Sequence, residues 1–103
     1  MGITGISKSS PNPFNPLTQG QTYFSYNLIE NSEVTVYVFN LSGELIWQKN
    51  FSPGQQGGKT DLNLVPWDGR NMYGEMVENG VYIFKISTAK KLLDSGKVIV
   101  LKN

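Results

Sequence analysis

The sequence predicts an all-β fold in which two antiparallel sheets pack face to face. Three observations support this. Apolar and polar residues alternate with a period of two in several separate segments, as in strands with one buried face. Turn signals rich in Gly, Asn and Pro separate these segments at intervals of roughly 8–12 residues. No window of helical length keeps apolar residues at i, i+3, i+4 and i+7. The 103 residues suffice for one domain, and about seven short strands in this arrangement make an immunoglobulin-like β-sandwich.

The N-terminal part of the chain carries few strand signals. Residues 1–9 are rich in Gly, Ser and Thr and are predicted to be the remnant of a linker, so that the domain spans residues 10–103. Residues 11–16 contain three prolines. Because proline fixes φ and has no backbone N–H, this segment is predicted to run extended along the edge of a sheet. Phe14 is its one large apolar side chain and is expected to anchor it to the core.

The rest of the chain is organised as strands and turns. Alternation, or β-branched and aromatic content, predicts strands at residues 22–28, 34–39, 45–51, 60–64, 81–86 and about 96–102. Gly43 is expected to adopt the positive φ that closes the hairpin between the second and third of these. Pro66 excludes the residues before it from the centre of a sheet, because it cannot donate to a ladder.

The composition excludes most enzyme classes. The chain has no Cys and no His, which removes thiol nucleophiles, disulfides, Cys/His zinc sites and triads with a His base. We therefore expect a non-enzymatic protein with no cofactor, no metal and no small-molecule substrate. A formal net charge of +1 gives no global field for nucleic acid or an anionic membrane, so nucleic acid is not an expected partner. The longest apolar run, residues 98–101, is far short of the roughly 20 residues that span a bilayer.

Six ordered segments make the pattern more specific than a generic sandwich: PNPFNPLT (11–18), FSYNL (24–28), VTVYVFNLSGE (34–44), WDGR (67–70), NGVY (79–82) and KVIVLK (97–102). In this order and spacing they resemble the C-terminal sorting domain of type IX secretion cargo proteins, a family related to the immunoglobulin-like domain of the flagellar hook-capping protein. The resemblance covers nearly all of the chain from Ser10 onward. It implies a non-catalytic tag that sends an exported protein through the periplasm and outer membrane to the cell surface or the medium.

The resemblance also implies roles for particular residues. Translocon recognition is the hypothesis for Gly80, Tyr82, Lys97, Val98, Ile99, Val100, Leu101 and Lys102. A structural motif is expected of Pro11, Asn12, Pro13, Phe14, Asn15, Pro16, Trp67, Asp68 and Gly69. The expected partners are a covalently linked N-terminal passenger domain and the outer-membrane secretion machinery. The domain is otherwise expected to be a monomer in solution.

Several of these residues also have simpler structural interpretations. Tyr82 stands at the start of a strand and is expected to form a tyrosine corner, with its hydroxyl bonded to upstream backbone. In the WDGR turn, Asp68 is expected to accept hydrogen bonds from local amides and Gly69 to supply an unusual backbone angle. Trp67 is expected to pack inward, although it could instead stack on a sugar in a binding loop.

Acidic and amide residues near this turn suggest a metal site only weakly. Asp68, Asn71, Glu75 and Glu78 carry oxygen ligands, but they do not fit the EF-hand spacing. Calcium is therefore the minority interpretation. The same residues offer carboxylate pairs for glycoside hydrolysis, but so small a sandwich implies no cleft for a substrate.

Charge is distributed unevenly along the chain. Residues 85–103 carry five lysines and one aspartate, a net charge of +4, whereas residues 1–84 carry four basic and seven acidic side chains, a net charge of −3. The basic end could be read by an acidic groove of the translocon. Equally, its lysines could protect a terminal apolar strand from edge-to-edge aggregation. Recognition by strand addition is also open, if the edge at residues 98–101 is uncovered.

Two other function classes fit the same sandwich. One is a structural assembly module of the hook-capping kind, although the loop at residues 51–62 leaves no room for the second barrel that the flagellar relative often carries. The other is a carbohydrate-binding or adhesion module attached to a secreted hydrolase. This last class predicts an exposed aromatic platform, for which Trp47, Tyr23 and Tyr37 are the candidates.

Overall fold

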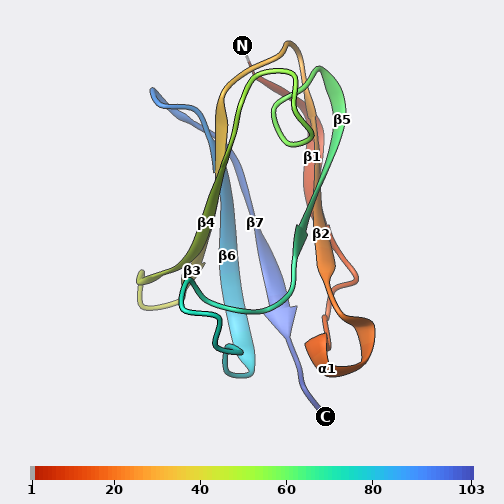
Figure 1. Cartoon of the computed structure of the whole chain (residues 1–103), viewed down its shortest axis with the longest axis vertical. Helices are drawn as coiled ribbons and strands as arrows, with labels where there is room; N and C mark the ends of the chain where they lie inside the picture. The colour runs from red at the N-terminus through yellow and green to blue at the C-terminus, as the bar shows by residue number, and fades with distance from the viewer. Residues whose placement is uncertain (1) are drawn as a thin grey trace.

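Two antiparallel sheets pack face to face in the computed structural model, which describes residues 2–103, residues 4 and 6 by their backbone alone (Figure 1). The strands are β1 (Ile3–Ser10), β2 (Thr22–Leu28), β3 (Val34–Asn40), β4 (Leu45–Phe51), β5 (Asp61–Trp67), β6 (Gly80–Ser87) and β7 (Leu92–Val100). One sheet has three strands in the order β1-β2-β5, and the other has four in the order β4-β3-β6-β7. The predicted all-β sandwich is confirmed.

The alternation in the sequence becomes an alternation of buried and outward-facing side chains. Along β3, Val34, Val36 and Val38 are buried, and the residues between them are half-buried on the outer face. β2 shows the same pattern over its seven residues. β7 begins four residues earlier than the predicted strand, at Leu92, and ends at Val100. Period-two alternation therefore predicted the central residues of the core strands well and the ends of β7 less well.

Aromatic rings join the two sheets across the core. Phe24 of β2 stacks on Phe84 of β6, with ring centroids 4.7 Å apart. Gly96 of β7 lies directly beneath the Phe84 ring, and a Cβ added at Gly96 would stand 2.6 Å from a ring carbon. Glycine is required at this position because the ring fills the space that a side chain would take.

The N-terminal residues form a strand, which corrects the prediction that residues 1–9 are a linker. Ile3–Ser10 make β1, which pairs antiparallel with β2. Two of its small polar residues are buried, and the Ser9 hydroxyl lies 2.8 Å from that of Thr22 in β2. Hydrogen-bonding to β2 creates this strand, and small polar residues give no apolar alternation that would reveal it in the sequence.

The loop between β4 and β5 is fixed by buried polar side chains at one end of the sandwich. Tyr26 donates its hydroxyl to the carbonyl of Gly57 at 2.6 Å, and burial raises the pKa of Tyr26 well above its ordinary value. Asn63 is fully buried and accepts from the backbone N–H groups of Gly57 and Lys59 at 2.8 and 3.2 Å. This end is therefore rigid and internally satisfied.

Segments from distant parts of the chain meet at the opposite end. The C-terminus emerges there beside α1 (Pro16–Gln19), at the foot of Figure 1. α1 has four residues and begins at Asn15, whose side chain accepts from the N–H of Leu17 at 2.9 Å. Among the described residues, no helix is long and apolar enough to span a bilayer.

Candidate functional site: the last strand and its clamp

The outer edge of β7 is paired with the proline-rich segment near the N-terminus. Phe14 donates its backbone N–H to the carbonyl of Ile99 at 2.7 Å and accepts from the N–H of Leu101 at 2.9 Å. The two segments run parallel at this point. The prediction of an edge segment is therefore confirmed at Phe14, which lies against the last strand of the chain, whereas residues 11–13 are bent and Pro16 begins α1. We refer to residues 11–16 as the clamp segment.

The side chain of Asn12 continues this pairing. It donates from Nδ2 to the carbonyl of Lys97 at 3.0 Å and accepts at Oδ1 from the N–H of Ile99 at 2.9 Å. An amide side chain offers the same donor and acceptor as a backbone peptide, so Asn12 replaces a strand residue where proline cannot donate. The edge of β7 is thus occupied from Lys97 to Leu101. The condition for strand addition, an uncovered edge at residues 98–101, is therefore not met.

Phe14 anchors the clamp segment in the core, as predicted. Its side chain is fully buried, and its ring lies 6.4 Å from that of Trp67 at the end of β5. Gly69, with φ of 80°, passes so close that an added Cβ would stand 3.1 Å from the Pro16 side chain and 3.3 Å from the Phe14 ring. The turn after β5 therefore packs directly against the clamp segment.

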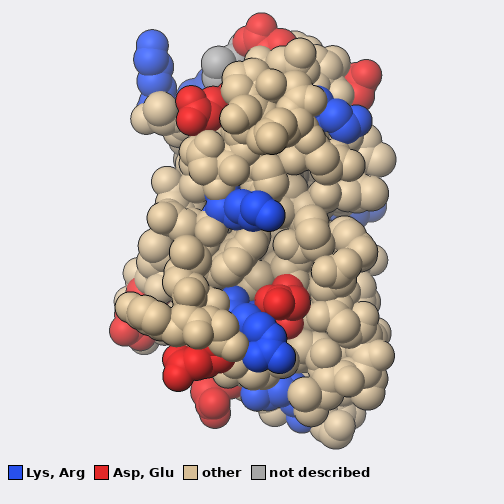
Figure 2. All heavy atoms as spheres, viewed as in Figure 1, with Lys and Arg blue, Asp and Glu red and all other residues tan. Residues whose placement is uncertain are grey.

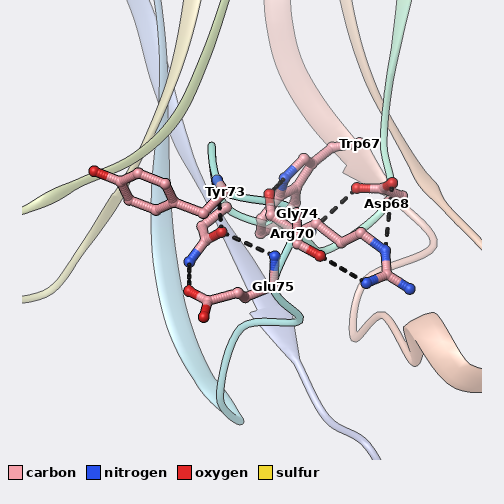
Figure 3. Close-up of polar contacts among 7 residues, drawn as sticks. Trp67, Asp68, Arg70, Tyr73, Gly74 and Glu75 are labelled. Carbon is pink, nitrogen blue, oxygen red and sulfur yellow. Dashed lines mark hydrogen bonds and ion pairs between the residues drawn. The ribbon is translucent and has the colours of Figure 1, made fainter.

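The turn that follows Trp67 is held by its own polar side chains (Figure 3). Trp67 is buried and donates its indole N–H to the carbonyl of Arg70 at 2.9 Å. Asp68 accepts from the N–H of Arg70 at 3.1 Å. These contacts confirm the predicted inward packing of Trp67, the capping by Asp68 and the positive φ of Gly69. They leave no free indole face for a sugar.

Two acidic residues of this loop, Asp68 and Glu75, are engaged in local contacts. Asn71 and Glu75 bond to one another side chain to side chain at 3.0 Å, and Arg70 donates to the carbonyl of Gly74 at 2.9 Å. Among the described residues, no three Asp or Glu side chains cluster as metal ligands. In Figure 3, the ring of Tyr73 points away from this network, and its side chain is 88% exposed.

Gly80 and Tyr82 lie on the other side of β7, at the start of β6. Gly80 pairs with Val100, and Tyr82 pairs with Val98. The Tyr82 hydroxyl donates to the carbonyl of Glu78 at 2.7 Å, which confirms the predicted bond to upstream backbone. Burial, and to a lesser degree the charge of Glu78, raises the pKa of Tyr82 above its ordinary value. Both residues therefore hold β7 in place through the β6–β7 ladder.

The side chain of Asn79 fixes the chain just after β7 ends. It accepts from the N–H of Lys102 at 2.8 Å and donates to the carbonyl of Lys102 at 3.4 Å. Asn79 belongs to the NGVY segment (79–82), but no pattern in the sequence indicates a role for it. Its bonds join positions 23 residues apart, so turn chemistry alone could not indicate them.

A second missed contact links β7 to the first strand. The N–H of Ser7 donates to the Asp94 side chain at 3.1 Å, and the N–H of Ser95 does so at 2.8 Å. Burial acts to raise the pKa of Asp94, but these hydrogen bonds outweigh it and hold the pKa below its ordinary value. Asp94 therefore adds stability above its unfolded pKa, and that stability is lost as pH falls through the lower folded value.

The structure separates six of the eight predicted recognition residues into two groups, and leaves Gly80 and Lys102 half-buried. Val98 and Val100 are fully buried, and Tyr82 is nearly so. Lys97, Ile99 and Leu101 are exposed, the latter two by 37% and 47%. A partner can touch the second group directly, whereas the first group holds the strand in place.

The three aromatic residues that a carbohydrate platform would need do not share a face. Trp47 lies between the sheets, with its ring 6.4 Å from that of Trp67. Tyr37 stacks on Phe39 on the outer face of the four-stranded sheet, and Tyr23 belongs to the three-stranded sheet. The geometry therefore gives no common platform for stacking on a glycan.

Comparison with known proteins identifies the fold. Neither a protein-family model nor a curated protein matches the sequence. Among solved structures, the chain is similar to part of PorZ, an essential bacterial surface component of the type IX secretion system of Porphyromonas gingivalis, with a TM-score of 0.63 and 19% identity. It is also similar to part of dimeric latent PorU from the same organism, with a TM-score of 0.70 and 17% identity.

The two likenesses span nearly the whole chain but little of either neighbour. The alignments cover 93% and 94% of this chain, and 11% and 9% of PorZ and PorU respectively. The sandwich therefore matches one module within each larger protein. At these identities, the comparison shows a shared fold.

Proposed function

We propose that this chain is a non-catalytic C-terminal sorting domain that directs a covalently linked passenger protein through the periplasm to the outer-membrane type IX secretion machinery and the cell surface. One observation carries the proposal. Sequence segments that resemble the sorting family converge in space on the last strand: the clamp segment on its edge, Trp67 and Gly69 against the clamp segment, and Asn79–Lys102 at its end.

The fold comparison is consistent with this role. PorZ, a surface component of a type IX secretion system, contains a module of the same fold. A shared fold does not by itself transfer a function. The proposal therefore rests on the convergence of the motif segments, and the likeness to PorZ agrees with it.

Under this proposal, the residues of the last strand and of β6 have different roles. Lys97, Ile99, Leu101 and Lys102 are the contacts offered to the secretion machinery. The strand is held in register along one edge by β6, where Gly80 pairs with Val100 and Tyr82 with Val98. The side chains of Val98 and Val100 are buried in the core. The clamp segment holds the opposite edge. Recognition then reads a folded surface, because strand addition at this edge would first have to remove the buried Phe14.

The role needs no catalysis, cofactor, metal, nucleic acid or small-molecule substrate. The chain carries no His or Cys, and the tyrosines with raised pKa values bond to backbone carbonyls within the fold. Groups tuned for acid–base chemistry would instead face an open cleft.

Truncation of the last strand tests the proposal. A reporter with an export signal, fused to this chain and expressed in a bacterium with a type IX system, is expected to reach the cell surface. Deletion of residues 97–103 is expected to leave it in the periplasm, and protease accessibility on intact cells measures the difference. A truncated fusion that still reaches the surface contradicts the proposal.

A folded variant keeps this test independent of stability. Ile99→Thr with Leu101→Thr changes two exposed side chains to good strand formers and is expected to fold. Its surface delivery should fall. The matched control, Leu62→Thr with Leu64→Thr, changes side chains that are 47% and 40% exposed on β5 and should be delivered normally. Equal delivery of both variants contradicts the assigned contacts.

A further inference from the structure

The outer face of the four-stranded sheet carries aromatic and basic side chains together. By register, Tyr37 and Phe39 of β3 face outward beside Lys85 and Ile83 of β6, and Ile83 pairs with Lys97 of β7. We refer to Tyr37, Phe39, Ile83, Lys85, Lys97 and Ile99 as the basic-aromatic face. It crosses β3, β6 and β7, which lie side by side in Figure 1.

Direct contacts order the side chains on this face. The rings of Tyr37 and Phe39 stack with centroids 5.8 Å apart. The ammonium group of Lys85 lies 5.0 Å from the centroid of the Phe39 ring, in a cation–π contact. Lys97 is a diagonal neighbour of Lys85 across the β6–β7 ladder. The two lysines are therefore near neighbours on a surface that also carries the apolar side chains of Phe39 and Ile83.

Two lysines stand at outward strand positions of this face, and Glu44, whose carboxylate accepts from the Asn40 side chain at 2.8 Å, lies at its end. In the described part of the chain, the outward positions of β3, β4, β6 and β7 include Lys85 and Lys97 but no Asp or Glu. Figure 2 shows basic and acidic side chains interspersed on the side of the molecule that it presents. The outward strand positions therefore carry a local excess of positive charge, although the net charge of the whole chain is +1.

A shallow hollow adjoins the face. It is lined by Phe39, Asn40, Leu41, Gly43, Ile83 and Lys85. Leu41 is 70% exposed at its rim. The hollow therefore offers apolar contact beside the lysines, which suits an apolar side chain next to a carboxylate.

We infer that the basic-aromatic face docks an acidic, partly apolar protein segment of the outer-membrane secretion machinery. Carboxylates of that segment pair with Lys85 and Lys97, and an apolar side chain packs on Phe39 and Ile83. Opposite charges steer such encounters and set their register. This inference rests on the proposed function and deepens it, since Lys97 and Ile99 belong to both the last strand and this face.

Charge reversal tests the inference. Lys85→Glu with Lys97→Glu is expected to reduce surface delivery of the fused reporter at least about tenfold, because like charges then face the acidic partner. Lys85→Gln with Lys97→Gln should fall between this variant and wild type, and Lys85→Arg with Lys97→Arg should restore delivery. Circular dichroism and thermal unfolding of each purified variant test whether it folds. If the double Glu variant is unfolded, the reduced delivery of the double Gln variant tests the inference in its place.

A matched control separates the face from general charge. Lys8→Glu with Lys49→Glu makes the same change in net charge on two exposed strand lysines elsewhere and should be delivered normally. Normal delivery of the Lys85/Lys97 reversal, or equal loss in both pairs, overturns the inference. If deletion of residues 97–103 still blocks delivery in the first case, the proposed function stands without this docking face.

A lipid target is the alternative outcome. Vesicles containing anionic phosphatidylglycerol serve as the probe in a sedimentation assay at physiological salt. The inference expects no difference between wild type and the Lys85/Lys97 reversal. Binding by wild type that the reversal abolishes, with reporter delivery unchanged, assigns the face to lipid headgroups and overturns the docking of a protein segment.

Discussion

Tyr82 shows how a residue predicted to take part in recognition contributes to the fold. Its ring lies 6.0 Å from that of Trp67 at an edge-on angle, and its hydroxyl is bonded to the carbonyl of Glu78. The side chain is 6% exposed, so a partner cannot reach much of it. In the proposed function, Tyr82 therefore acts indirectly, through the position that it gives to β7.

Replacing Tyr82 by Phe removes this hydrogen bond and keeps the ring. We expect the free energy of unfolding to fall by about 0.5–1.5 kcal/mol, the usual net contribution of one such bond. Urea unfolding followed by circular dichroism measures it. Tyr73→Phe is the control, since Tyr73 is 88% exposed and its loss should change nothing. An unchanged stability for Tyr82→Phe would remove the tyrosine-corner interpretation.

At the residue scale, the sequence predicted contacts that are local along the chain. Asp68 and Gly69 follow turn chemistry within a few residues, and Tyr82 bonds four residues back. The bonds of Asn12 reach residues 85 and 87 positions away. No local rule gives such a contact, so the sequence could place Asn12 in a motif but could not indicate what it binds.

The clamp segment is the element that decides how the last strand is presented. It occupies the edge of β7 with backbone and side-chain groups, and Phe14 fixes it in the core. Edge strands that remain open invite pairing with other chains, and proteins commonly cover them. The clamp segment therefore keeps an apolar terminal strand from pairing between copies, whatever else it does.

Replacing Asn12 by Ala opens part of this edge. We expect amide hydrogen exchange at Ile99 to become faster, because its N–H loses the acceptor at Asn12 Oδ1, and the unfolding free energy to fall by about 1 kcal/mol. The control, Asn50→Ala, removes a side-chain bond that Asn50 of the edge strand β4 makes to Thr35 of β3. It should leave the exchange rate at Ile99 unchanged. Unchanged exchange at Ile99 in Asn12→Ala would show that the clamp segment does not protect the edge.

At the element scale, prediction succeeded where side chains alternate and failed where backbone pairing alone makes a strand. β2, β3 and β6 carry clear apolar alternation and were placed closely. β1 is built on glycine and small polar residues, and β2 supplies the pairing that makes it a strand. Pro66 was expected to exclude its strand from the centre of a sheet, and β5 indeed lies at an edge.

Over the whole molecule, the two ends of the sandwich differ in kind. One end is closed by buried polar bonds around Asn63 and Tyr26. The other gathers the clamp segment, the Trp67 turn, Asn79 and the C-terminus around β7. The all-β class followed from the sequence, since alternating strands without helical periodicity bury their apolar faces in a sandwich or a barrel. Which segments would meet at each end depended on topology and pairing, which alternation does not specify.

If the proposed function holds, the folded sandwich as a unit, rather than its last segment alone, is the signal for secretion. An exported fluorescent reporter fused to residues 1–103 tests it, with surface fluorescence measured in a bacterium that has a type IX system and in a mutant that lacks its translocon. For the fusion to residues 1–103, we expect surface signal only in the strain with an intact translocon. For a fusion to residues 80–103 alone, we expect none in either strain. Equal surface signal from the short fusion, or surface signal that survives loss of the translocon, would contradict it.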